Sequence, residues 1–231
     1  MKKSPIRACP SSQETVLGMC YFAFQLLVLP GLLTLANGLL THPLRDAELN
    51  FLYYALNFAA VLVIFRDYLA DSANQAVKHP AILCQAIILG LAAYYACRIA
   101  VTALAGVLVP SFSNYNDASI AAMQQESRLL VFIGTVILVP PAEECFFRGL
   151  IFRNLYGKSP WAAYLISMLA FSMIHIVGYW GSYTPGQLLI ALLQYLPAGL
   201  CLAWSYTKAG TLFAPIAIHA LVNFLTLSTW R

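Results

Sequence analysis

The sequence has little charge. Only 10% of its 231 residues are Asp, Glu, Lys or Arg, against about 25% in an ordinary soluble domain. Charge this sparse cannot cover the surface of a soluble protein of this size. The net charge of +4 is also small and spread over the segments between apolar runs. It lacks the concentrated basic surface of a nucleic-acid-binding protein, so we expect no nucleic-acid partner.

Two metal-binding patterns are also absent from the sequence. The six cysteines are scattered, and no spacing among them is typical of a zinc site or of a disulfide framework. No His-Glu-x-x-His segment occurs, the motif that places two zinc ligands and a base on one helix face. These absences make a zinc site less expected but do not exclude one.

Long apolar runs fill most of the chain instead. Hydrophobic residues make up 61% of it, and the runs approach or exceed the roughly 20 residues that a membrane-spanning helix needs. The runs are continuous, whereas strands of a membrane barrel alternate over short segments. We predict an all-α polytopic membrane protein, one transmembrane domain over 1–231, with its active site in a helix-bundle cavity. The seven expected spans cover about 16–40, 49–66, 81–108, 129–155, 160–180, 187–207 and 211–230.

Proline, glycine and polar segments punctuate these runs. Pro30-Gly31 is expected to break the first span and Pro197 to kink the sixth. The polar stretch 66–80 is expected to be a loop. The stretch 110–120 is expected to be a loop that passes into a short surface helix before Arg128.

Basic residues between the spans predict the orientation, because cytoplasmic segments carry the excess of Lys and Arg. With the N-terminus inside, eight basic residues lie on the cytoplasmic side and three outside, which favours a cytoplasmic N-terminus. The bilayer is then a partner of the protein, and a bacterial inner (plasma) membrane is the expected location. The eight are Lys2, Lys3, Arg7, Arg66, Lys78, Arg153, Lys158 and Lys208, and the three are Arg45, Arg128 and Arg231.

Charged residues inside the fourth span are the most unusual feature. Glu143, Glu144 and Arg148 lie in an apolar run, where each charge costs on the order of 3 kcal/mol on insertion scales. Glu144 and Arg148 are four residues apart, so they share a helix face and are expected to form a supporting ion pair. Glu143 lies about 100° round the helix and is left to do chemistry. The preceding Pro140-Pro141 should open the helix and admit water.

Three further polar residues occupy later spans. His175 lies four residues after Phe171, and His219 and Asn223 are four residues apart on one face. Each alone is more often a satisfied core residue. Together with Glu143, they form a set able to perform hydrolysis: a base, a group to hold water and donors for an oxyanion. We expect all four in one cavity at mid-membrane depth that opens toward the cytoplasm.

The motifs Glu143-Glu144-x-x-x-Arg148, Phe171-x-x-x-His175 and His219-x-x-x-Asn223 resemble the three-motif signature of the CPBP family. This family contains the type II CAAX prenyl proteases and the bacteriocin-processing or immunity proteins, also called Abi. The resemblance covers about 129–227 as a catalytic core. It implies a glutamate-dependent intramembrane endopeptidase without a metal, acting on a membrane-anchored protein or peptide. Glu143 and His175 would activate water, His219 and Asn223 would stabilise the oxyanion, and Glu144 and Arg148 would support the site.

Several alternatives stay open. The second enzyme hypothesis is a zinc protease with His175, His219 and Glu143 as ligands. The non-enzyme hypothesis is an immunity, scaffold or transport protein that uses the polar cluster as a ligand site. Arg98, in the third span, either extends to the membrane interface, the reading we favour, or binds a substrate carboxylate. The substrate itself is open between a prenylated C-terminus, a leader peptide, a sorting anchor and a membrane-bound regulator.

Overall fold

The structure is a computed structural model that describes residues 6, 8–110 and 112–229. Lys2, Lys3, Arg7 and Arg231, which entered the orientation argument, lie outside the described residues. Within these ranges all regular secondary structure is helical, which confirms the predicted fold class. The first helices are α1 (Ser12–Leu27), α2 (Leu29–Gly38), α3 (Asp46–Ile64), α4 (Arg66–Lys78), α5 (Pro80–Leu108) and α6 (Tyr115–Glu126).

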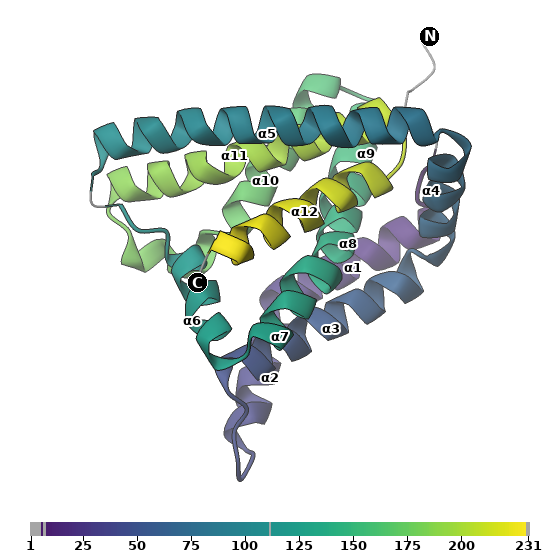
Figure 1. Ribbon diagram of the computed structural model, residues 1–231. Coiled ribbons are helices and arrows are strands. Elements are labelled where there is room, and N and C mark those ends of the chain that lie inside the picture. Colours follow the sequence, from purple (N-terminus) through teal and green to yellow (C-terminus); the bar gives the residue numbers. More distant parts are fainter. Residues whose placement is uncertain (1–5, 7, 111, 230–231) are drawn as a thin grey trace.

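The second half of the chain carries the predicted motifs. One long helix runs from Arg128 to Tyr156 and includes two π-helical stretches. Its parts are α7 (Arg128–Phe132), η1 (Ile133–Leu138), α8 (Val139–Glu144), η2 (Cys145–Phe152) and α9 (Arg153–Tyr156). It is followed by α10 (Pro160–Ile174), the 3₁₀ helix η3 (Val177–Ser182), α11 (Pro185–Ala209) and α12 (Phe213–Thr229). Figure 1 shows α5 lying along α11 and α12, the three packing against one another.

Among the described residues, fewer than seven helices are long and apolar enough to cross a membrane. Four helices are long and apolar enough to cross a membrane, and α1 with α2, bent by 45°, is a fifth candidate. The helices α10 and α12 are apolar but have only 15 and 17 residues. At 1.5 Å per residue they reach about 22 and 26 Å, less than the roughly 30 Å of a hydrocarbon core. A count of seven is therefore not confirmed.

Three predicted boundaries change. Residues 66–80 are not a loop but α4, because Tyr68, Ser72 and Ala76 form one buried face and Glu14 accepts the backbone N–H of Tyr68 at 2.9 Å. The first span breaks at Val28, which puts Pro30 in the first turn of α2. The fifth span ends at Ile174, well before residue 180, so that His175 caps α10 rather than lying inside it.

The bundle has two ends, and the contacts between connecting segments define them. At the end we call the basic end, Ser72 O of α4 accepts from Thr211 Oγ1 at 2.7 Å. At the opposite end, which we call the α6 end, Glu126 accepts from the backbone N–H of Ala47 at 2.9 Å. There, too, the Tyr183 hydroxyl accepts from the N–H of Tyr115 at 2.9 Å.

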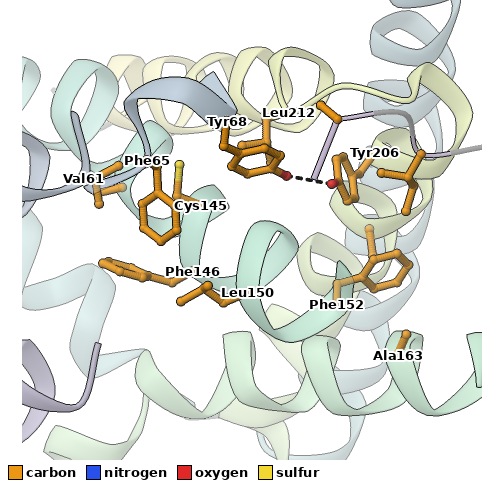
Figure 2. Close-up of a cluster of buried hydrophobic side chains, with 14 residues drawn as sticks. Val61, Phe65, Tyr68, Cys145, Phe146, Leu150, Phe152, Ala163, Tyr206 and Leu212 are labelled. Atoms are coloured by element: carbon orange, nitrogen blue, oxygen red, sulfur yellow. Dashed lines mark hydrogen bonds between the residues drawn. The ribbon is translucent and has the colours of Figure 1, made fainter. Parts of the chain in front are cut away.

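A buried aromatic cluster closes the basic end. Figure 2 shows Phe65 and Phe146 near Leu150, and Phe152 near Tyr206, whose hydroxyl shares a hydrogen bond of 2.7 Å with that of Tyr68. Aromatic side chains of this size contribute much of the burial energy of a core. This cluster anchors α8 and η2, which carry the two glutamates and the arginine, against α3, α4 and α11.

Candidate active site

A cavity of about 480 Å³ lies in the half of the bundle nearer the α6 end, within the size range of small-molecule sites. Glu143, His175, His219 and Asn223 all line it. It extends from Phe147, near the middle of the bundle, to Asp117 on α6. The four residues expected to share one cavity therefore do so.

The two prolines shape the helix beside Glu143. In the π-helical stretch η1 the backbone N–H of Val139 bonds to the carbonyl of Gly134, five residues back. The same register would pair the carbonyl of Thr135 with residue 140, but Pro140 has no N–H. Asn223 Nδ2 donates to that carbonyl at 2.8 Å instead. The predicted opening of the helix before Glu143 is thus a π-helix, and Asn223 supplies the missing donor.

Glu144 holds two partners at once. Its Oε2 lies 3.1 Å from Arg148 Nε, and both side chains are 0% exposed, so the predicted ion pair is present. Neither of these two atoms has a hydrogen-bond partner among the described residues, so the contact is an ion pair without hydrogen-bond geometry. Glu144 Oε1 lies 3.0 Å from His219 Nδ1. The sequence argument missed this second contact, because spacing does not tell which distant helix faces Glu144.

Arg148 is fully buried and needs several contacts to stay so. Its Nη2 donates to the carbonyl of Gly199 at 3.1 Å. Its guanidinium carbon lies 4.7 Å from the centre of the Phe171 ring, within the range of a cation–π interaction. A Cβ at Gly199 would come within 2.9 Å of the Met168 backbone, so only glycine lets α11 approach α10 this closely.

The carboxylate of Glu143 lies near the imidazole of His219. Glu143 Oε2 lies 3.9 Å from His219 Nε2 and, within the described part of the chain, this buried oxygen has no hydrogen-bond partner. Because His219 Nδ1 faces a carboxylate, we assign its proton to Nδ1, which leaves a lone pair on Nε2. A separation of 3.9 Å between two acceptors suits a bridging water.

His175 occupies the neighbouring wall of the cavity. Its Nδ1 lies 2.8 Å from the carbonyl of Phe171, which places the proton on Nδ1 and leaves Nε2 as an acceptor. Its ring stacks on Tyr195 at 4.4 Å between centroids. Among the described residues no direct contact joins His175 to Glu143, so a shared water-binding role stays a prediction.

Polar residues on α6 complete the cavity wall, and the sequence argument did not single them out. The Tyr195 hydroxyl donates to Asp117 Oδ1 at 3.2 Å and lies 3.1 Å from Asn116 Nδ2. Burial raises the pKa of the Asp117 carboxyl above its ordinary value, while Tyr195, Arg98 and His175 act in the opposite direction. In the sequence, the polar composition of residues 113–117 is the only signal that could have predicted that Asn116 and Asp117 line the cavity.

The described residues contain no group of three or more His, Cys, Asp or Glu side chains placed to hold a metal ion. His175, His219 and Glu143 therefore do not converge as a zinc ligand set in this geometry. Metal analysis of the purified protein tests the zinc hypothesis.

Several helices are long enough to cross a membrane, so the chain is an integral membrane protein. The cavity between its helices is lined by a carboxylate, two imidazoles and an amide, which together form a candidate hydrolytic site. Residues 125–225 match the model of a protein family described as type II CAAX prenyl endopeptidase Rce1-like. This segment is similar to that family, and the match confirms the resemblance carried by the three motifs. No curated protein and no solved structure matches the chain.

Proposed function

We propose that the protein is a glutamate-dependent intramembrane endopeptidase that hydrolyses a peptide bond of a membrane-associated protein or peptide. One observation carries the proposal. Glu143 presents a buried oxygen without a hydrogen-bond donor 3.9 Å from His219 Nε2, inside a cavity of substrate size. A carboxylate and an imidazole at this separation are suited to hold and deprotonate one water molecule.

The reaction follows from these positions. A water bridging Glu143 and His219 attacks the scissile carbonyl carbon, and Glu143 takes its proton. The tetrahedral intermediate then collapses as that proton passes to the leaving nitrogen, the C–N bond breaks, and a carboxylic acid and an amine are released. Glu144 holds the imidazole of His219 in one orientation throughout, as carboxylates that orient a catalytic histidine do in other hydrolases.

Asn223 and His175 are the remaining members of the proposed site. Asn223 Nδ2 uses one of its two hydrogens on Thr135, and the second is available for an oxyanion. The family resemblance implies that His219 stabilises the oxyanion and that His175 helps to activate the water. The short distance between His219 and Glu143 favours His219 as the partner of the water, with His175 acting on the substrate side of the cavity.

The orientation in the membrane is part of this proposal. We expected both a cytoplasmic N-terminus and a cavity that opens to the cytoplasm, and the position of the cavity in the bundle favours keeping only the first of these. The cavity lies toward the α6 end, whereas Arg66, Lys78, Lys158 and Lys208 flank the helices at the basic end. Because basic residues mark the cytoplasmic side, we retain the cytoplasmic N-terminus in a bacterial inner membrane and place the cavity toward the outer face.

A pair of fusions tests that orientation. The C-terminal end of α12 lies at the α6 end, where the carbonyl of Leu227 accepts from Gln124 Nε2 at 3.4 Å. Alkaline phosphatase fused after Arg231 should be active and green fluorescent protein at the same position dark, because the first folds outside the cytoplasm and the second inside. The reverse result would contradict the cytoplasmic N-terminus and restore a cavity that opens inward.

Cleavage assays test the activity. The purified protein is incubated with membrane peptides of the four candidate classes: a prenylated C-terminus, a leader peptide, a sorting anchor and a membrane-bound regulator. Mass spectrometry of the products identifies the bond that is cut, and the Glu143→Gln protein is the control. Cleavage of none of them, or equal cleavage by the control, would leave the immunity, scaffold or transport function as the better explanation.

A further inference from the structure

Tyr195 of α11 links the candidate site to α6. Its ring stacks on the imidazole of His175, with 4.4 Å between the centroids and 24° between the planes. Its hydroxyl lies 3.2 Å from both Asn114 Oδ1 and Asp117 Oδ1, which share its proton, and it accepts from Asn116 Nδ2 at 3.1 Å. One side chain thus touches a residue of the proposed site with its ring and the start of α6 with its hydroxyl.

His175 depends on such a contact for its orientation. It caps α10, so its side chain is not packed between two turns of that helix. Its Nδ1 lies 2.8 Å from the carbonyl of Phe171, which holds one edge of the ring, and the stack on Tyr195 restrains one face. A group that acts on a substrate must be held closely, since a misplacement of about 1 Å can lower a rate about 10²-fold.

The start of α6 is itself fixed in place. Asn114 caps the helix, and its Oδ1 accepts from the backbone N–H groups of Asn116 and Asp117 at 3.1 and 3.2 Å. Its Nδ2 donates to Gln194 Oε1 at 2.7 Å, which ties the cap to α11. These bonds hold the three partners of the Tyr195 hydroxyl in a defined arrangement.

Arg98 of α5 favours the charged form of Asp117. Burial raises the pKa of the Asp117 carboxyl, and the nearby charge of Arg98 opposes this rise. A charged carboxylate is the stronger acceptor for a hydroxyl. Arg98 Nη1 donates to the Tyr94 hydroxyl at 3.1 Å and to Thr226 Oγ1 at 3.2 Å. These contacts lie inside the bundle, so the extension of Arg98 to the membrane interface, which we favoured from the sequence, is corrected.

We propose that Tyr195 is a positioning residue through which α6 sets the orientation of His175. The polar groups of α6 hold the hydroxyl, and the ring holds the imidazole in the direction that the reaction needs. This inference rests on the proposed function, because that function gives His175 its task. Asn116 and Asp117, the partners on α6, lie outside the segment 125–225 that matches the family.

Nuclear magnetic resonance of isotope-labelled histidine tests the placement without a substrate. The protein has four histidines, and the spectrum of His175→Gln assigns the ring signals of His175. In Tyr195→Phe, which keeps the ring and loses the hydroxyl, we expect these signals to shift or broaden and those of His219 to stay. Tyr164→Phe is the matched control, because the Tyr164 hydroxyl also joins α10 to α11, by a bond of 2.9 Å to Thr207. Unchanged His175 signals in folded Tyr195→Phe would overturn the proposal.

Variants of α6 test the other half of the link. Asn116→Ala combined with Asp117→Ala removes one donor and one acceptor of the Tyr195 hydroxyl, so it should change the His175 signals as Tyr195→Phe does. Asp117→Asn keeps a side-chain oxygen as acceptor and should leave them in place. Melting curves show which variants are folded, and the α6 variants carry the test if Tyr195→Phe is not. His175 signals that stay unchanged in the folded double variant would contradict the role of α6.

Cleavage kinetics separate this inference from the proposed function. We expect Tyr195→Phe to lower kcat about tenfold to a hundredfold with little change in KM. In a His175→Gln background it should cause no further loss, because it acts through that imidazole. Equal losses in both backgrounds would overturn the positioning role. A change in the His175 signals without cleavage of any peptide would support the placement of His175 by Tyr195 and contradict the endopeptidase.

Discussion

His219 Nδ1 lies 3.0 Å from Glu144 Oε1, while Nε2 of the same ring lies 3.9 Å from Glu143 Oε2. The carboxylates of two consecutive glutamates thus lie near the two nitrogens of one imidazole. The first contact holds the ring in one orientation, whereas the Glu143 oxygen is buried and has no hydrogen-bond partner among the described residues. Glu144 is fully buried beside Arg148, whereas Glu143 lines the cavity.

Replacing Glu143 tests the proposed base. Glu143→Gln keeps the size and polarity of the side chain but removes the proton acceptor. We expect turnover to fall by about 10²–10⁴, the usual contribution of general acid–base catalysis, with an unchanged melting temperature. The measurement is cleavage of a fixed peptide by both proteins. Equal activity would remove Glu143 as the base.

Replacing Glu144 should act first on stability. Glu144→Gln leaves the fully buried Arg148 without its counter-charge, and breaking such a pair costs about 3–5 kcal/mol. The neutral amide should also hold His219 less firmly and lower turnover in the remaining folded protein. Asp71→Asn, at an exposed position of α4, is the control for thermal unfolding in detergent. A Glu144→Gln protein as stable as this control would contradict the supporting role.

Arg148→Ala removes the other partner of the pair. It leaves Glu144 buried with an uncompensated charge and removes the bond to the Gly199 carbonyl, so the yield of folded protein should drop. Fluorescence size-exclusion chromatography of the expressed protein measures that yield, with the exposed Arg128→Ala as reference. An Arg148→Ala protein that is fully stable yet inactive would point to a catalytic role instead.

Gly199→Ala tests the close approach of α11 to α10. The added Cβ would meet the Met168 backbone at 2.9 Å, and overpacking of this kind costs about 1–3 kcal/mol. The Gly199 carbonyl that holds Arg148 should shift as well. Gly106→Ala in α5 is the matched control, because nothing lies within 4 Å of its Cβ; it should be neutral or stabilising by about 0.5–1 kcal/mol. Similar melting temperatures for both variants would show that the helices adapt.

Metal analysis decides between the glutamate mechanism and the zinc hypothesis. We expect chelators to leave the activity of the wild type unchanged and the purified protein to contain no stoichiometric metal. Elemental analysis before and after chelation, alongside the cleavage assay, makes the measurement. Zinc lost together with activity, and restored with it, would support the zinc protease.

Much of the architecture follows from local sequence properties. Apolar length predicts the long helices, and the spacing of Glu144 and Arg148 predicts their pair, because residues four apart on a helix must meet. The effect of Pro140 is also local, because its missing N–H interrupts the backbone hydrogen bonds of the helix whatever the helix packs against. Local pattern was less informative for α4, because its polar composition is typical of a loop. The helix is stabilised by burial of Tyr68 and by a hydrogen bond to Glu14 of α1.

The sequence by itself determined the class of protein, the helical content and the set of polar residues that a membrane should not contain. Only the tertiary structure decided how those residues pair. The contacts of His219 with Glu144, of Asn223 with Thr135 and of Arg98 with Thr226 join residues 75, 88 and 128 positions apart. Such contacts depend on the rotation and depth of each packed helix, and helical periodicity fixes a face within one helix but not its neighbour in another.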